Sequence, residues 1–198
     1  NFMSSAIREA YRAGELDRAR AMLDRLDGLF GRGASPPNHK YNEDLDVFVM
    51  DETKGEYDRQ PHMAPNDVIA SLRYGLRVGV GQRRPDVYKE AIKFANEVTE
   101  YFRTHEGIDF DTKMGTGRMR DLVAVLGKSA EIAFLQLMID PSVSYEERAQ
   151  IWAQVDEFEP ELRLRTSDRI RPLVERELQM GPLAGRVSID EFLPEPPG

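Results

Sequence analysis

The sequence predicts an all-α fold of antiparallel helical hairpins, about seven helices in all, with one long ordered insertion loop. Three observations lead to this expectation. Apolar residues recur at three- and four-residue steps along most of the chain, which places them on one face of a helix. Glycine, proline and capping residues stand between these stretches. Hydrophobic residues make up 40% of the chain and charged residues 31%, which is typical of a folded, well-solvated protein.

The first two helices are expected over residues 5–13 and 16–30. Gly14 ends the first helix, because glycine adopts the left-handed conformation of a helix C-terminus without steric cost. The second helix carries its apolar residues on one face: Leu16, Ala19, Leu23, Leu26 and Phe30. Its opposite face carries arginines and acids, so we expect the two helices to pack through their apolar faces as a hairpin.

Residues 31–65 are expected to form a long, ordered loop. The stretch GRGASPPNHKYN has the glycines and prolines of a loop, and LDVFVMD, residues 45–51, is interpreted as one short strand or an extended segment. A connection of this length inside a compact domain is usually functional or disordered. Its aromatic residues favour a loop packed on the body of the protein. Five of its residues are candidate partner contacts: His39, Tyr41, Phe48, Tyr57 and His62.

Three further helices are expected over residues 66–81, 86–105 and 118–139. Asn66 and Asp86 are the expected N-caps of the first two, since their side chains accept hydrogen bonds from the free N–H groups of a first turn. Residues 118–139 carry apolar side chains on more than one side. A helix of this kind is buried, so we expect it to be the central one.

The last two helices are expected over residues 145–158 and 167–180. Ser144 is the expected cap of the first, and Pro172 is placed near the first turn of the second, where proline is tolerated. From Gly181 the chain is expected to be extended and rich in proline.

The expected domain organisation is one helical domain over residues 1–180, with the loop 31–65 inserted in it, followed by an extended tail over 181–198. The two ends of the chain, NFMSS and EFLPEPPG, are typical of a segment cut from a longer protein. The compartment is left open by the sequence.

The stretch AYRAGELDRARAMLDRL, residues 10–26, has the spacing of a close-packed helical hairpin. A G-E-L turn is followed by Ala19 and Leu23, which match an A-x3-F pair. The stretch resembles the tetratricopeptide repeat, a family that packs antiparallel helix pairs of about 34 residues each. A small residue such as Ala19 allows the two helix axes to approach closely. The resemblance implies a stack of helical hairpins.

Later hairpins repeat this pattern less closely. Tyr74-Gly75 stands where the family has L-G, with Ala91 in the following helix, and Ala149 occupies the equivalent place in a third pair. These copies are spaced more widely than the repeat length. The sequence therefore leaves two architectures open, a tetratricopeptide-like stack and an irregular helical bundle.

Composition and missing motifs exclude several classes of function. The formal net charge is -8, so the basic footprint of a nucleic-acid-binding protein is missing. The chain has no cysteine, which excludes disulfides, thiolate metal sites and cysteine catalysis. No G-x-S-x-G, Ser/His/Asp or H-E-x-x-H pattern is present, and no histidine spacing enforces a metal site. We therefore expect no enzyme, no cofactor, no bound metal, no nucleic acid and no membrane insertion by this segment.

One loop offers a candidate anion site. KMGTGRMR opens the helix expected from residue 118, where free N–H groups and basic side chains meet. The candidate residues are Lys113, Gly115, Gly117, Arg118 and Arg120. The alternative is a loop whose glycines only provide entry to the helix.

Three hypotheses about function follow from these observations. The first is a non-enzymatic helical module that binds a protein or peptide, as part of a larger chain. The second is a structural or oligomerisation segment of an anchored envelope protein. The third is a small-ligand or enzyme domain that uses the loops 31–65 and 106–118 as a pocket.

Overall fold

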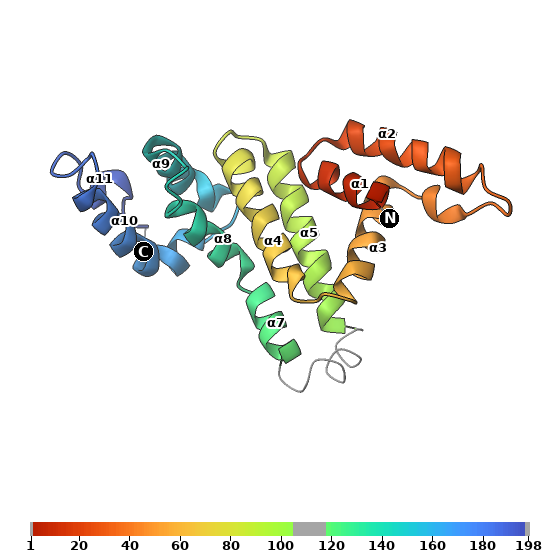
Figure 1. Cartoon of the computed structure of the whole chain (residues 1–198). Coiled ribbons are helices and arrows are strands. Elements are labelled where there is room, and N and C mark those ends of the chain that lie inside the picture. Colours follow the sequence, from red (N-terminus) through yellow and green to blue (C-terminus); the bar gives the residue numbers. More distant parts are fainter. Residues whose placement is uncertain (1, 105–117, 197–198) are drawn as a thin grey trace. The chain divides into compact units, whose positions relative to one another are not determined.

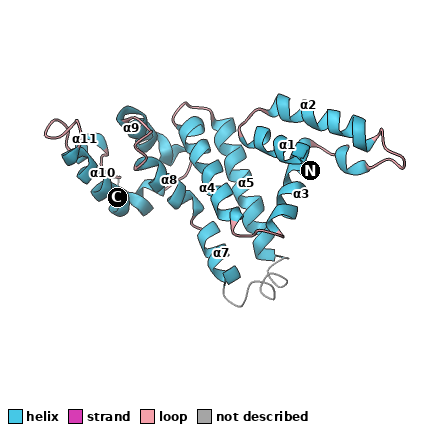
Figure 2. Ribbon diagram, viewed as in Figure 1, coloured by secondary structure: helices cyan, strands magenta, loops and turns pink. Residues whose placement is uncertain are grey.

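The computed structural model describes residues 2–104 and 118–196, which are helical and contain no strand (Figure 1, Figure 2). The expected all-α class is therefore confirmed. The described residues form about ten helices, more than the seven expected. Two of the additional helices lie in segments expected to be loop or tail, and a third arises because the expected helix 118–139 is divided in two. None of the described helices is both long enough and apolar enough to cross a membrane.

The chain divides into two compact units, Asn1–Ala64 and Pro65–Gly198. This boundary differs from the division at residue 180 that the sequence led us to expect. The N-terminal unit contains these helical elements in chain order: α1 (Phe2–Arg12), α2 (Leu16–Leu26), a π-helical turn (Asp27–Gly31), a 3-10 turn (His39–Tyr41) and α3 (Leu45–Tyr57).

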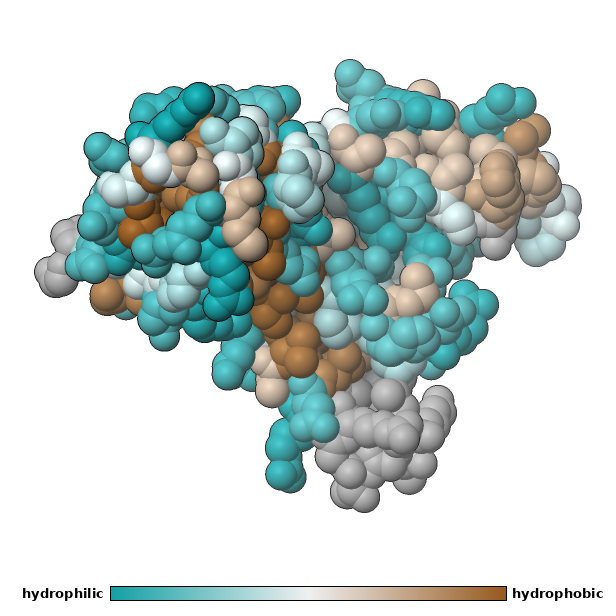
Figure 3. Space-filling view, turned by 60° about the vertical axis from the view of Figure 1, so that its left-hand side comes forward, coloured by the Kyte–Doolittle hydropathy of each residue, from teal (hydrophilic) through white to brown (hydrophobic). Residues whose placement is uncertain are grey.

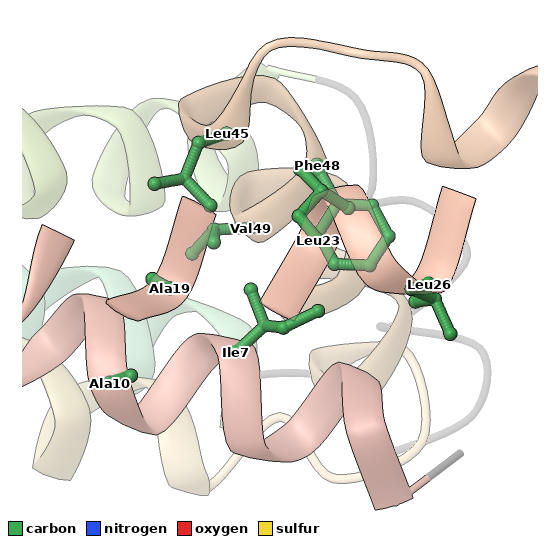
Figure 4. Close-up of a cluster of buried hydrophobic side chains, with 8 residues drawn as sticks. All are labelled: Ile7, Ala10, Ala19, Leu23, Leu26, Leu45, Phe48 and Val49. Carbon is green, nitrogen blue, oxygen red and sulfur yellow. The ribbon is translucent and has the colours of Figure 1, made fainter. Parts of the chain in front are cut away.

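The core of the N-terminal unit is formed where α1, α2 and α3 meet (Figure 4). Gly14 adopts a φ of +75°, so it makes the left-handed turn between α1 and α2 that the sequence predicts. All three helices contribute buried apolar side chains to one cluster: Ile7, Ala10, Ala19, Leu23, Leu26, Leu45, Phe48 and Val49.

The expected strand or extended segment at residues 45–51 is wrong, and so is the interpretation of residues 31–65 as loop alone. Leu45–Tyr57 is the helix α3. Its buried positions, Leu45, Phe48, Val49 and, further on, Tyr57, recur at three- and four-residue steps or multiples of them. Val47 lies in the middle of the apolar run but is half exposed, which a helix allows and an extended core segment does not.

The C-terminal unit holds the remaining described helices. In chain order they are α4 (Met63–Tyr74, beginning at the unit boundary), a π-helical turn (Gly75–Val80), α5 (Pro85–Thr104), α7 (Arg118–Leu126), α8 (Ser129–Met138), α9 (Tyr145–Gln154), a 3-10 turn (Val155–Glu157), α10 (Leu162–Met180) and α11 (Ile189–Phe192).

The chain segment that continues α4 packs very closely on α5. A methyl group placed at Gly75 would lie 2.6 Å from the Cβ of Ala91, and one at Gly79 would lie 2.6 Å from the Cβ of Tyr88. These distances are too short for real carbon atoms, so both positions require glycine for this approach. Gly75 and Ala91 therefore lie against each other where the two segments pack.

Several expected helices in the C-terminal unit have different bounds in the structure. α5 begins at Pro85, so the expected cap Asp86 lies inside the helix, and α9 ends at Gln154 rather than at residue 158. α4 begins at Met63 rather than at the expected cap Asn66, because Pro65 lies in its first turn, where a missing N–H costs nothing. The expected central helix 118–139 is interrupted by a turn at Gly127, which separates α7 from α8.

α10 begins at Leu162 rather than at Ser167, so Pro172 lies in its interior and not in its first turn. The buried stripe of α10 repeats every four residues: Leu162, Thr166, Ile170, Val174 and Leu178. Thr166 is polar, and its hydroxyl donates to the carbonyl of Leu162 at 2.6 Å. Because Thr166 is polar, the apolar pattern in the sequence does not extend to Leu162, and the helix is predicted to start too late.

Apolar side chains are not confined to the interior. Figure 3 shows a face on which hydrophobic residues gather in a band bordered by hydrophilic ones. The large apolar side chains most exposed among the described residues include Phe2, Leu29, Phe30, Leu164 and Met180.

Candidate peptide-binding surface

The five loop residues expected to contact a partner do not form one surface. His39 and His62 are exposed, whereas Phe48 and Tyr57 are fully buried and belong to the core of the N-terminal unit. Tyr41 is half-buried, and its ring lies 6.1 Å from that of Phe48. The aromatic residues of this segment therefore hold α3 in place rather than face solvent.

Three residues of the candidate anion site, Lys113, Gly115 and Gly117, lie outside the described residues. Arg118 begins α7, and Arg120 is exposed. The described ranges contain no group of three or more histidines, aspartates or glutamates that could hold a metal ion.

A different site emerges at the C-terminal end of the described chain, where residues 188–196 fold back onto α9 and α10 (Figure 1). We call this stretch the docked segment. It begins with the single helical turn α11 and continues without regular secondary structure from Leu193. The expectation of a wholly extended tail from Gly181 is therefore wrong.

A capping box starts the docked segment. The backbone N–H of Glu191 donates to the Ser188 hydroxyl at 3.2 Å, and the backbone N–H of Ser188 donates to the Glu191 carboxylate at 2.9 Å. The backbone N–H and then the hydroxyl of Ser188 hold the pKa of Glu191 below its ordinary value. This reciprocal pair fixes the direction in which the chain leaves the turn.

Two apolar side chains anchor the docked segment. Phe192 is 8% exposed and Leu193 is 0% exposed. The Phe192 ring packs edge-to-face against Tyr145 of α9, with 5.6 Å between ring centroids and 76° between planes. Burying two large apolar side chains supplies a few kcal/mol, at about 1.5–3 kcal/mol each.

Side chains of α9 and α10 bind the main chain of the docked segment. The indole N–H of Trp152 donates to the carbonyl of Pro194 at 2.9 Å, and Nε of Arg171 donates to the carbonyl of Leu193 at 3.1 Å. Arg171 also donates to Glu195 at 2.8 Å and to Asp190. One guanidinium therefore contacts a carbonyl and two carboxylates of the segment.

A part-buried ion pair joins α9 and α10 beside the surface that receives the segment. Arg148 makes two parallel hydrogen bonds of 2.8 Å to Glu177 and a third of 2.9 Å to the carbonyl of Met138. The Tyr145 ring lies 4.6 Å from the guanidinium carbon of Arg148. Hydrogen bonding by Arg148 lowers the pKa of Glu177, against the opposing effect of burial.

Trp152 is held in place by a stacking contact in the interior of the unit. It is fully buried, and its ring stacks on Phe134 of α8 with 5.8 Å between centroids and 14° between planes. Its N–H is thereby aimed at the docked segment.

An open groove of about 450 Å³ runs beside the docked segment. α10 forms one wall, and the segment forms the other. The residues lining it include Leu164, Asp168, Arg171 and Pro172 of α10, and Ile189 and Glu195 of the segment. The arrangement can hold a short peptide through apolar contacts, main-chain hydrogen bonds and one basic side chain.

Sequence reasoning missed this site, although one local signal was available. The stretch SIDEF has the capping-box spacing of Ser188 and Glu191 directly before two large apolar residues. The proline content of the flanking residues favoured an extended tail instead.

Comparisons with known proteins add no assignment: the sequence matches no protein-family model and no curated protein, and no solved structure matches the fold.

Proposed function

We propose that the chain is a non-enzymatic, protein-binding helical module, and that α9 and α10 form the surface that holds a short segment of the partner. The close contact of Gly75 with Ala91 supports a tetratricopeptide-like use of small residues between helices within the unit that carries this surface. The proposal includes the expectation that the partner is a protein or peptide.

The observation that carries the proposal is the way Trp152 and Arg171 bind main-chain carbonyls. Hydrogen bonds to a peptide backbone give affinity without demanding one sequence, and adjacent side-chain pockets add selectivity. The same surface therefore suits any segment that offers carbonyls and apolar side chains at the positions of Phe192 to Pro194.

The experiment uses an opened variant, defined as the full chain with Phe192→Ala and Leu193→Asp. The second substitution places a charge where a buried leucine sat, so the docked segment leaves the surface. The ligand is a fluorescein-labelled peptide with the sequence of residues 187–196, VSIDEFLPEP. Fluorescence anisotropy measures its binding.

We expect saturable binding with a Kd below about 1 mM. A tethered segment stays docked only if the Kd of the same sequence as a free peptide is lower than the segment's effective concentration, which is of the order of millimolar. Circular dichroism checks that the opened variant keeps its helices. The matched control adds Arg171→Ala to the opened variant and weakens binding. A folded opened variant that binds no peptide at millimolar concentration contradicts the proposed function.

A further inference from the structure

The docked segment identifies the chemistry of the partner, on the premise of the proposed function. Three features of the segment are used by the surface: an acid-rich capped turn, an aromatic-leucine pair, and a proline carbonyl. We propose that the surface selects a partner segment with this pattern, acid–x–aromatic–Leu–Pro–acid, and that residues 188–196 compete with that partner for the surface.

The apolar pair sets the first selection rule. Leu193 is fully enclosed, and the Phe192 ring meets the edge of Tyr145, so a smaller residue at either place leaves a void. Aromatic side chains supply large contact area with few rotatable bonds.

Arg171 sets the second rule. Its side chain is 16% exposed, and it contacts carboxylates on both sides of the apolar pair, Asp190 before it and Glu195 after it. Other arginines of α10 are engaged elsewhere, since Arg163 pairs with Asp156 and Arg169 with Glu131. Acidic residues flanking the apolar pair are therefore favoured in a partner.

Proline at the position of Pro194 fits the third contact. Trp152 donates to the carbonyl of this residue, and the contact does not involve a backbone N–H. The N–H that proline lacks is therefore not needed for this contact. Its fixed φ also reduces the conformational freedom that a bound segment must lose.

Competition follows from how the segment is attached. Residues 181–187 link α10 to the docked segment by turns, with Gly185 at a φ of +70°. A link this short gives the segment an effective concentration of the order of millimolar. Two apolar anchors and a few hydrogen bonds must offset the ordering of nine residues, so the segment leaves the surface far more easily than the helices separate.

The test compares the intact chain with the opened variant, using three labelled peptides: the sequence VSIDEFLPEP, the same peptide with the change Phe192→Ala, and one with Asp190→Lys and Glu195→Lys. We expect the intact chain to bind the first peptide at least about tenfold more weakly than the opened variant does. We expect the alanine peptide to bind the opened variant at least about tenfold more weakly than the first peptide, and the lysine peptide several-fold more weakly at low salt.

A second readout needs no substitution. Hydrogen exchange of the intact chain reports the amides of Phe192 and Leu193, which donate to the carbonyls of Ser188 and Ile189. We expect both amides to exchange faster than those of α10, and we expect excess unlabelled peptide to quicken their exchange further.

Each outcome separates the claims. Equal affinity of the intact chain and the opened variant overturns competition and leaves the proposed function standing. Equal binding of all three peptides overturns the selection pattern. A reciprocal dimer of the intact chain, formed by exchange of residues 188–196 and seen by light scattering, overturns a separate partner in favour of a second copy. No binding in any arm ends both proposals.

Discussion

Two arginines of the C-terminal unit make similar hydrogen bonds in opposite surroundings. Arg148 lies between α9 and α10 with a side chain 2% exposed, and its partner Glu177 is 31% exposed on a long helix. Arg171 lies on the outer side of α10, and its carboxylate partners, Asp190 and Glu195, are 75% and 77% exposed. The first pair joins two helices of the fold, whereas the second holds the short segment that we propose a partner displaces.

The difference teaches which contacts stabilise the unit and which are exchangeable. Tyr145 connects the two regions, because its ring meets Arg148 and also Phe192. Arg148 packs against the Tyr145 ring, and Phe134 stacks on the Trp152 ring, so both rings have contacts that do not involve the docked segment. The surface is therefore preorganised, which reduces the free energy spent on ordering when a peptide binds.

The largest effect is expected from the pair between Arg148 and Glu177. Arg148→Ala leaves Glu177 and the carbonyl of Met138 without their donor. Glu177 is 31% exposed and water can solvate it, so we expect the free energy of unfolding to fall by about 2–3 kcal/mol through the loss of charge-assisted hydrogen bonds. Arg171→Ala is the matched control, and its exposed pairs predict a loss of about 1 kcal/mol or less. Urea denaturation followed by circular dichroism measures both. Similar losses in the two variants contradict the division into fixed and exchangeable contacts.

An intermediate loss of unfolding free energy is expected from substitutions of the apolar anchors Phe192 and Leu193. This loss has an upper limit, which distinguishes the docked segment from the helices of the fold. Leu193→Ala at a fixed core position would cost about 2–5 kcal/mol. The segment can instead detach, so the loss is limited to the free energy of docking. We expect Phe192→Ala and Leu193→Ala together to cost clearly less than the sum of the two single losses, as measured by urea denaturation.

The control pair for saturation lies in the helices that remain folded. Val98→Ala on α5 and Ile170→Val on α10 both reduce buried apolar side chains. We expect their losses to add within about 0.5 kcal/mol. Full additivity at Phe192 and Leu193 would mean that the docked segment is an integral part of the core.

The sequence predicts the helices best where the apolar period is clean. In the stripe predicted over residues 16–30, Ala19, Leu23 and Leu26 are buried, whereas Leu16 and Phe30 at its ends are about half exposed. The cap at Ser144 is confirmed, since its hydroxyl accepts the N–H of Glu147 at 3.1 Å. Where apolar residues are contiguous, as in the run around Phe48, the period is masked and a helix is mistaken for a strand. The break at Gly127 is hidden because apolar residues precede it and resume after Lys128 and Ser129, so the pattern reads as one helix.

The candidate surface depends on contacts that no local pattern encodes. Trp152 meets a carbonyl 42 residues later, and Arg171 meets carboxylates 19 and 24 residues later. Only the capped turn of the docked segment has a signature in the sequence. The aromatic residue type alone suggests either contact with a partner or burial in the core. Phe48 and Tyr57 are buried.

The smallest effect on the free energy of unfolding is expected from lowering the pH. It distinguishes the pair between Arg148 and Glu177 from the docked segment. Arg148 lowers the pKa of Glu177 from its ordinary value of 4.5, so the unfolded state binds more protons than the folded state between the two pKa values. This stabilisation is therefore present above pH 4.5 and is lost as the pH falls through the folded pKa. Urea midpoints measured from pH about 6 down to about 3 give the slope, and Glu177→Gln should reduce it.

Glu191 provides the matched control in the docked segment. Its pKa is also lowered, by the backbone N–H and hydroxyl of Ser188, so the sign of its pH dependence is the same. Protonation of Glu191 weakens only the capped turn. We expect Glu191→Gln, which keeps a hydrogen-bond acceptor, to leave the slope of global stability unchanged while the amides of Phe192 and Leu193 lose the acid dependence of their exchange. A change in the global slope from Glu191→Gln, comparable to that from Glu177→Gln, would show that both regions unfold as one.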